Sequence, residues 1–255
     1  DMLQNHLMQL LCLVAMEPPN TMTAADIRDE HVKVVRALRV IDETSVADHV
    51  VRGQYTGGWY QAEELTGYLE LEDADNPQSD TETFVAVKAF IDNWRWAGVP
   101  FYVRTGKRMG EKVTEIVITY KTLAHNIFAS HENAPNRLVI RLQPNEGIEM
   151  HMLSKQHGIE AGTALTPQAL DLNFLSASGI DRIPDAYERL FLDVFRADQS
   201  LFVGREEVEQ SWLWCDRLIS AWEHNRLKVK PYAAGTKGPA QSDLLIGRDG
   251  RSWHE

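Results

Sequence analysis

An acid and a histidine open the chain, Asp1 and His6, at the start of a stretch with the spacing of an amphipathic helix. Because successive helical residues are about 100° apart, His6 lies beside the apolar stripe of that helix. Residues of these two types could belong to an active site, whereas a lone boundary histidine more commonly has its hydrogen bonds satisfied structurally. The stripe consists of Leu3, Leu7, Leu10, Leu11 and Val14.

A basic turn at residues 104–108 is the second group of residues with chemical potential. It contains Lys107 next to a glycine and is followed by Lys112. Cations around a glycine can receive an anion such as phosphate through charge-assisted hydrogen bonds, and the glycine lets the backbone come close. A solvated basic turn that pairs with surface acids is the alternative, and the spacing alone does not separate the two.

The composition suits a soluble protein with one large core or two modest ones, at 255 residues, 44% hydrophobic and 25% charged. The formal charge of -11 argues against broad attraction to nucleic acid or anionic lipid. No apolar run is long enough to span a bilayer, and no signal-peptide pattern precedes the first helix. We therefore expect no nucleic-acid partner and no membrane partner.

The cysteines and histidines give no sign of a metal site. Cys12 falls on the apolar helix and Cys215 in a tryptophan-rich stretch, so both are predicted to be buried thiols rather than a disulfide. Free thiols indicate a reducing compartment, and we expect a cytoplasmic protein. The nine histidines are scattered without ligand spacing, and there is no HExxH or CxxC sequence, so we predict no metal.

The chain is organised as helices, then strands, then helices. Residues 16–19 contain two prolines that end the first helix, and Thr23 begins a capping sequence for a second helix reaching about Leu38. In residues 84–91 the side chains that would point to either face of a strand are mostly apolar, which is typical of a strand buried on both faces. Alternating patterns then predict antiparallel strands at 114–120, 138–142 and 148–152, with a hairpin loop at 144–147, and this order favours an α+β fold.

Two further apolar stripes with helical spacing are predicted to lie in the core near the C-terminal end. Residues 228–255 are rich in Gly, Lys, Ser and Pro and are predicted to be extended loop. Without an internal repeat or a linker, we expect one domain spanning residues 1–255. The first stripe is Tyr187, Leu190, Phe191, Val194 and Phe195, and the second is Val208, Trp212, Cys215, Leu218, Ile219 and Trp222.

The chain contains no GxGxxG fingerprint and no P-loop. Between a strand and a helix, these glycine-rich sequences would cradle the pyrophosphate of a dinucleotide. A nicotinamide-dependent enzyme would therefore need another segment to bind its cofactor, and we predict no cofactor-binding residues here.

Several segments, in order along nearly the whole chain, resemble the glucose-6-phosphate dehydrogenase family. They are residues 1–16 (DMLQNHLMQLLCLVAM), 93–98 (NWRWAG), 99–108 (VPFYVRTGKR), 140–146 (IRLQPNE) and 185–190 (DAYERL). The resemblance implies the family's C-terminal α+β domain, with a large, mainly antiparallel sheet and helices packed on one face. It also implies that the family's N-terminal Rossmann domain, which binds NADP, is missing upstream of Asp1.

The resemblance further implies roles for individual residues. His6 matches the general base, Asp1 a sugar contact, Lys107 and Lys112 contacts to the anionic substrate, and Gln143 a position near the sugar. Arg104 and Arg141 match positions at which some members hold a second, structural NADP+, whereas Val113 and His151 depart from that pattern.

The implied function is NADP-dependent oxidation of glucose 6-phosphate to 6-phosphogluconolactone in the oxidative pentose phosphate pathway. These residues would contribute the base and part of the sugar-phosphate site, so the isolated chain is expected to be inactive. The alternative is a non-catalytic oligomerisation or sugar-phosphate-binding module related to this domain. We also expect a homodimer or tetramer that forms through the sheet face carrying Val117, Thr119, Arg141, Gln143 and His151.

Overall fold

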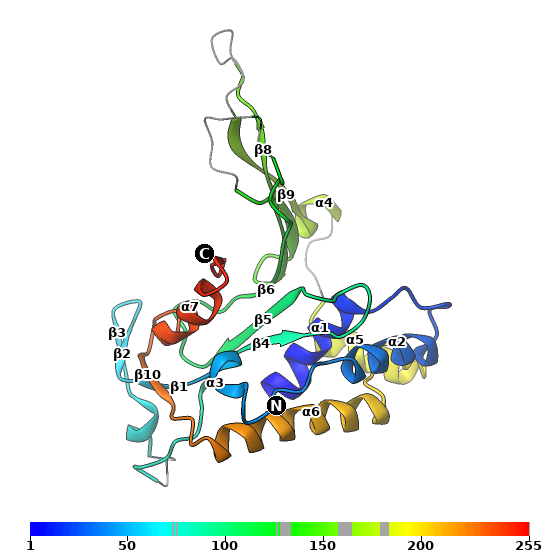
Figure 1. Cartoon of the computed structure of the whole chain (residues 1–255). Coiled ribbons are helices and arrows are strands. Elements are labelled where there is room, and N and C mark those ends of the chain that lie inside the picture. Colours follow the sequence, from blue (N-terminus) through cyan, green and yellow to red (C-terminus); the bar gives the residue numbers. More distant parts are fainter. Residues whose placement is uncertain are drawn as a thin grey trace. The chain divides into compact units, whose positions relative to one another are not determined.

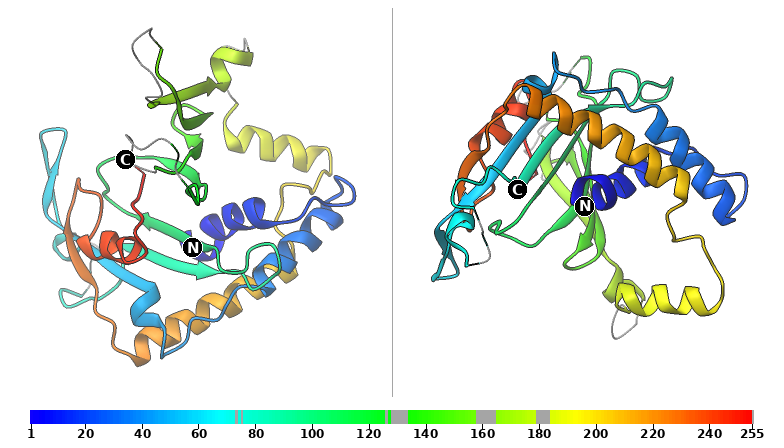
Figure 2. Two further views of the ribbon diagram at one scale, coloured as in Figure 1. Left: turned by 45° about the horizontal axis from the view of Figure 1, so that its top comes forward. Right: turned by 90° about the horizontal axis from the view of Figure 1, so that it is seen from below.

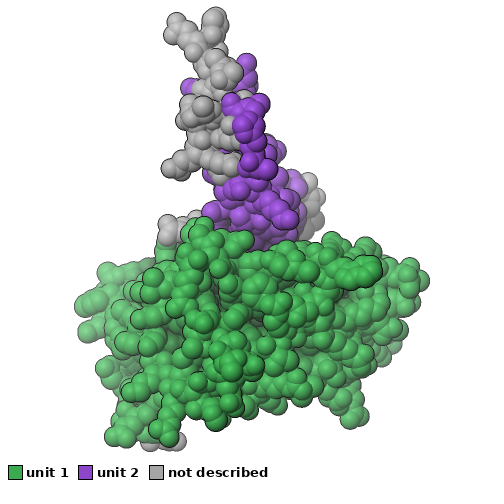
Figure 3. Space-filling model, in the orientation of Figure 1, with its two compact units in different colours: residues 1–111, 187–253, 255 green, residues 112–186, 254 purple. Residues whose placement is uncertain are grey.

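The computed structural model divides the chain into two compact units, which Figures 1 and 3 show. The first unit contains residues 1–111 and 187–253, and the second contains residues 112–186 and 254. The expected range of a single domain thus contains two units, each with a sheet of its own. The structure describes residues 1–72, 74, 76–125, 127, 134–157, 165–178 and 184–254.

The helices are distributed along the chain on both sides of the strand-rich middle. They are η1 (Met2–Leu7), α1 (Met8–Ala15), α2 (Ala24–Arg36), α3 (Val46–His49), η2 (Tyr68–Glu70), α4 (Phe174–Ser178), α5 (Ala186–Phe195), α6 (Arg205–His224) and α7 (Ala240–Gly247). The element η1 is a turn of π-helix, and η2 is a turn of 3-10 helix. None of the described helices combines the length and the apolar character that crossing a membrane requires.

The strands form two four-stranded sheets and a small ribbon. The first sheet has the order β10 (Lys230–Ala233), β1 (Val50–Thr56), β4 (Phe84–Phe90), β5 (Pro100–Gly106). The second has the order β6 (Thr114–Thr119), β7 (Arg137–Gln143), β8 (Gly147–Lys155), β9 (Leu165–Asn173), and the ribbon pairs β2 (Gly58–Tyr60) with β3 (Glu63–Leu65). All these pairings are antiparallel except the parallel pair β1 and β10, which confirms the α+β class, with the described strands divided between two four-stranded sheets and the ribbon.

Strand β4 is buried on both faces, as its sequence predicts. Val85 and Val87 face the core formed with helices α1, α2 and α6. Phe84 and Ala86 point to the opposite face, where Leu245 of α7 joins a second, smaller core. Figure 2 shows these helices around the first sheet. The first sheet therefore carries helices on both faces, in contrast to the predicted packing on one face.

The predicted boundaries of the first two helices are confirmed. Helix α1 ends just before the proline-containing segment, and the hydroxyl oxygen of Thr23 accepts a hydrogen bond from the backbone N–H of Asp26 at the start of α2. The two cysteines are buried, as predicted. Burial raises the pKa of the Cys215 thiol to about 12 and raises that of Cys12 as well, so both thiols stay protonated at neutral pH.

The prediction that the apolar stripe of α5 lies in the core is wrong for the described chain. Tyr187, Phe191 and Phe195 are exposed, whereas the most buried residue of α5 is Asp193. The Nε of Arg189 donates a hydrogen bond to the Asp193 carboxylate at 3.1 Å. Helical spacing predicted the helix correctly, but spacing cannot say whether a neighbouring element covers the stripe.

The prediction of an irregular C-terminal segment is also wrong. Strand β10 pairs in parallel with β1, and helix α7 follows it and packs against the sheet. Gly238 makes this packing possible because its φ is +100° and a Cβ there would lie 2.6 Å from the Phe84 ring. Gly238 thus serves close packing, which the glycine-rich composition of this segment does not reveal.

The second sheet has one apolar face and one mixed face. Its register aligns the apolar residues of one face in two rows, namely Ile118, Leu138, Met150 and Leu170, and Ile116, Ile140, Ile148 and Leu172. The opposite face carries ion pairs, in which Arg141 contacts Glu149 and Asp171, and His151 contacts Glu149. The predicted strands and the hairpin between β7 and β8 are confirmed.

Candidate active site

The first helical turn holds the predicted acid and base side by side. Nδ1 of His6 lies 3.8 Å from an Asp1 carboxylate oxygen, and these side chains are 57% and 76% exposed. At this distance the two groups form a loose ion pair when the imidazole is protonated, not a hydrogen bond. The turn is π-helical, with the N–H of Met8 bonded to the carbonyl of Leu3, a geometry that recurs at functional sites. His6 is therefore open to a ligand.

Helix α1 is fixed below that turn by apolar packing. Met8, Leu11 and Cys12 are buried in the first core, each contributing on the order of 1 to 3 kcal/mol of burial free energy. At the other end of the helix, the Trp96 indole N–H donates to the Ala15 carbonyl at 2.9 Å. The Trp96 ring also packs edge-on against Phe101 of β5, with the ring centroids 5.1 Å apart. Helix α1 is thus held at both ends of its buried side.

A buried polar cluster connects α1 to two other helices. Gln9, one helical turn after His6, donates to Oε1 of Glu207 on α6 at 2.7 Å. Nδ1 of His31 on α2 lies 2.9 Å from the same oxygen. The side chains of Glu207 and His31 are only 1% and 7% exposed, so a buried carboxylate joins three helices.

The hydrogen bonds of this cluster decide the ionisation of Glu207. Burial alone acts to raise the pKa of this carboxyl, because a low-dielectric surrounding disfavours the charged form. The hydrogen bonds from His31 and Gln9 outweigh burial, and the pKa of Glu207 is lowered. The carboxylate therefore stays charged at neutral pH. Sequence spacing does not reveal this cluster, because three single residues spread over some 200 positions leave no local pattern.

Lys107 stands at a rigid position directly after β5. Its backbone N–H donates to the Thr83 carbonyl at 2.8 Å, and its own carbonyl accepts from the Tyr232 hydroxyl at 2.7 Å. Gly106 permits this close packing, since a Cβ there would lie 2.7 Å from the Phe84 ring. The Lys107 side chain itself is exposed. A fixed backbone with a free ammonium group suits an anion contact.

Two of the remaining predicted residues lie in the second unit. Lys112 is exposed just before β6, and Gln143 is exposed at the end of β7. The register pairs Gln143 with Thr114, two residues after Lys112, so both residues lie at the same end of this strand pair. The structure therefore groups Asp1 and His6 on one turn and places Lys107 directly after β5, a strand that contacts that turn. It also groups Lys112 with Gln143.

The two arginines that match structural-nucleotide positions are both engaged within the chain. The Arg104 guanidinium lies over the Trp253 ring, 4.4 Å from its centroid. Arg141 is paired with Glu149 and Asp171, the latter at 2.7 Å. An anion at Arg141 would have to compete with two carboxylates, so these residues do not fit a second nucleotide well.

The comparison with known proteins decides the family. The family described as "Glucose-6-phosphate dehydrogenase, C-terminal domain" matches residues 1–254. The chain belongs to this family. The glucose-6-phosphate 1-dehydrogenase of Rhizobium meliloti (strain 1021) is 51% identical over 257 aligned residues, which cover 100% of this chain and 52% of that protein. That of Dickeya dadantii (strain 3937) is 49% identical, with the same shares covered.

Solved structures of the family have the same fold. "Glucose-6-phosphate dehydrogenase in complex with its substrate glucose-6-phosphate" matches with a TM-score of 0.86 at 32% identity, covering 99% of this chain and 50% of that one. The Mycobacterium avium enzyme matches with a TM-score of 0.78, also at 32% identity, covering 99% of this chain and 49% of that one. The resemblance drawn from sequence motifs is thereby confirmed. The chain spans about half the length of the curated relatives it matches.

Proposed function

We propose that these residues supply the catalytic base and part of the sugar-phosphate site of an NADP-dependent glucose-6-phosphate 1-dehydrogenase. One observation carries the proposal: an exposed histidine on the first helical turn shares a unit with a lysine at the end of a strand that contacts this turn. Family membership supports the reaction, the oxidation of glucose 6-phosphate to 6-phosphogluconolactone. We place this reaction in the pentose phosphate pathway of the cytoplasm.

His6 acts in this proposal as the general base. Its imidazole takes the proton of the C1 hydroxyl while hydride leaves C1, so that C1–OH becomes the lactone carbonyl. NADP+, which we expect to be bound mainly by a segment outside these residues, would accept the hydride. The Asp1 carboxylate lies 3.8 Å from the imidazole, beyond hydrogen-bond distance, and both side chains are largely exposed to water. This leaves room for Asp1 to hydrogen-bond the sugar.

The lysines neutralise the substrate. Glucose 6-phosphate carries a phosphate dianion at neutral pH, and ammonium groups bind such an anion through charge-assisted hydrogen bonds. Lys107 and Lys112 take this role, and the amide of Gln143 contacts the sugar. Because phosphate lies far from the reacting carbon, these contacts stabilise the bound substrate and the transition state alike.

The full-length protein that contains these residues tests the proposal. We expect it to reduce NADP+ when glucose 6-phosphate is added, measured as absorbance at 340 nm, and we expect the isolated chain of residues 1–255 to show no turnover. Turnover by the isolated chain would contradict the proposal that a segment outside these residues binds most of the NADP. An inactive full-length protein would favour the non-catalytic module instead.

We further propose that the second sheet pairs with its copy, in a dimer or a tetramer built from dimers, through the mixed face that carries Val117 and Thr119. This face combines apolar residues with Arg141 and His151, a composition typical of protein interfaces, in which arginine is enriched. Two-fold symmetry is the commonest arrangement for a homo-oligomer.

Light scattering at micromolar concentration measures the assembly. We expect twice the monomer mass or a multiple of it, and Val117→Glu should shift the protein to monomer because it places an unpaired carboxylate in the interface. Val113→Glu is the matched control, since Val113 is exposed and precedes the strand. A monomeric wild-type protein, or equal dissociation by both variants, would contradict the assignment.

A further inference from the structure

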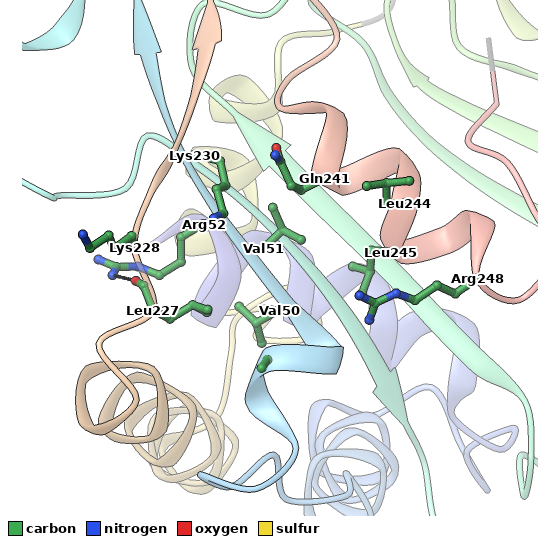
Figure 4. Close-up of a pocket in the computed structure, with 11 residues that line it drawn as sticks. Val50, Val51, Arg52, Leu227, Lys228, Lys230, Gln241, Leu244, Leu245 and Arg248 are labelled. Atoms are coloured by element: carbon green, nitrogen blue, oxygen red, sulfur yellow. Dashed lines mark hydrogen bonds between the residues drawn. The ribbon is translucent and has the colours of Figure 1, made fainter.

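A small pocket of about 230 Å³ lies in the first unit, away from the first helical turn. Figure 4 shows that it is bounded by the start of β1, by the segment leading into β10 and by one side of α7. Val50, Val51, Leu244 and Leu245 give it apolar walls. Concave apolar sites with a few polar groups are the usual form of small-molecule sites.

Four cations line this pocket in a protein whose formal charge is -11. They are Arg52, Lys228, Lys230 and Arg248. None of the described residues that line the pocket carries a carboxylate. Figure 4 shows Lys228 and Lys230, two residues apart in extended chain, on the β10 side of the pocket and Arg248 on the α7 side.

The two arginines have partners within the protein. Nη1 of Arg52 donates to the Leu227 carbonyl at 2.7 Å, Nη2 donates to Glu82 at 2.8 Å, and the guanidinium lies 4.9 Å from the centroid of a Trp222 ring. Arg52 is therefore a fixed wall of the pocket. Arg248 donates to Asp48 at 2.9 Å in an exposed pair, which is weak and can exchange partners.

The two lysines of the pocket differ from the arginines in having no carboxylate partner among the described residues. Within the part of the chain that the structure describes, neither Lys228 nor Lys230 has a carboxylate at ion-pair distance. With both arginines balanced by acids, the pocket keeps two uncompensated positive charges. A phosphate monoester carries a charge of about -1.5 to -2 at pH 7, which matches two ammonium groups, whereas a single carboxylate would balance only one.

We infer that this pocket binds a small phosphate monoester, with the phosphate on Lys228 and Lys230 and an apolar organic part against Val51, Leu244 and Leu245. Both lysines donate to the phosphate oxygens as mobile point charges, and Arg248 can join them by leaving Asp48. The site is independent of the proposed sugar-phosphate site at Lys107.

Phenyl phosphate is a suitable probe, because it joins a phosphate dianion to an apolar ring. Isothermal titration of the full-length protein should show one saturable site with a Kd on the order of 1 mM. Phenol and inorganic phosphate should each bind more weakly, since each lacks half of the ligand. If either binds as tightly as the ester, the assignment of the pocket is wrong.

Variants locate the binding. Lys228→Gln and Lys230→Gln should each weaken phenyl phosphate binding at least about threefold, and Lys230→Arg should retain it, because charged hydrogen bonds supply the affinity. Lys121→Gln, an exposed lysine of the second unit, and Lys107→Ala should change the Kd by less than about twofold. Absence of a saturable site, or loss of binding in Lys107→Ala with retention in the Lys228→Gln and Lys230→Gln variants, would overturn the inference.

Discussion

Replacing His6 with asparagine in the full-length enzyme is expected to lower kcat by about a hundredfold to ten-thousandfold. Asparagine keeps hydrogen-bonding groups of similar reach but cannot accept the C1 hydroxyl proton. Because the base acts in the transition state and contributes little to ground-state binding, the KM for glucose 6-phosphate should stay within about tenfold of the wild-type value. Steady-state kinetics at saturating NADP+ measure both parameters.

Two further variants serve as controls for the effect of His6→Asn on kcat and KM. His224→Asn removes another exposed histidine, which pairs with Glu43 on the surface, and should leave both parameters unchanged within about twofold. Lys107→Ala should show the opposite pattern, a raised KM with little change in kcat, since an anion contact stabilises substrate and transition state alike. Near-normal turnover of His6→Asn would remove His6 from the mechanism.

Replacing Glu207 with alanine is expected to lower the free energy of unfolding by about 3 to 5 kcal/mol. The change leaves the buried His31 imidazole and Gln9 amide without their shared acceptor and opens a space between three helices. Urea unfolding of the 255-residue chain measures the effect. Glu209→Ala is the control on the same helix, because its pair with Arg205 is exposed and should be worth less than about 1 kcal/mol.

The Glu207 contribution should also depend on pH with a definite sign. The ordinary pKa of the carboxyl is 4.5, and the folded protein lowers it. Stability from this group is therefore fully present above about pH 4.5 and is lost as the pH falls through the lower pKa of the folded state. The difference between wild type and Glu207→Ala should be constant from pH 7 to pH 5 and shrink in more acidic solution. A difference that grows on acidification would contradict the charged state assigned to Glu207.

Local patterns predicted those parts of the fold that local chemistry decides. The proline-containing end of α1, the Thr23 cap, the doubly buried strand β4 and the β7–β8 hairpin all follow from residues close together in sequence. The wrong predictions concern partners that sequence spacing does not reveal. The α5 stripe has the correct period but is exposed, and Gly238 after β10 serves tight packing against Phe84.

The candidate site also depends on contacts that its sequence does not reveal. The adjacency of Asp1 and His6 depends on the π-helical turn, because residues five apart do not share a face of an α-helix. The rigid setting of Lys107 depends on Thr83 and Tyr232, which no local motif connects to it. The burial of Glu207 has no local signal either, because a glutamate in a helix usually faces solvent and only the folded chain brings it to His31.

A crystal structure of the full-length enzyme with glucose 6-phosphate shows directly whether His6 is the base. We expect an imidazole nitrogen of His6 within about 3 Å of the C1 hydroxyl oxygen, with the ammonium group of Lys107 on the phosphate. A complex in which the C1 hydroxyl meets a different base, with His6 turned to solvent, would contradict this expectation.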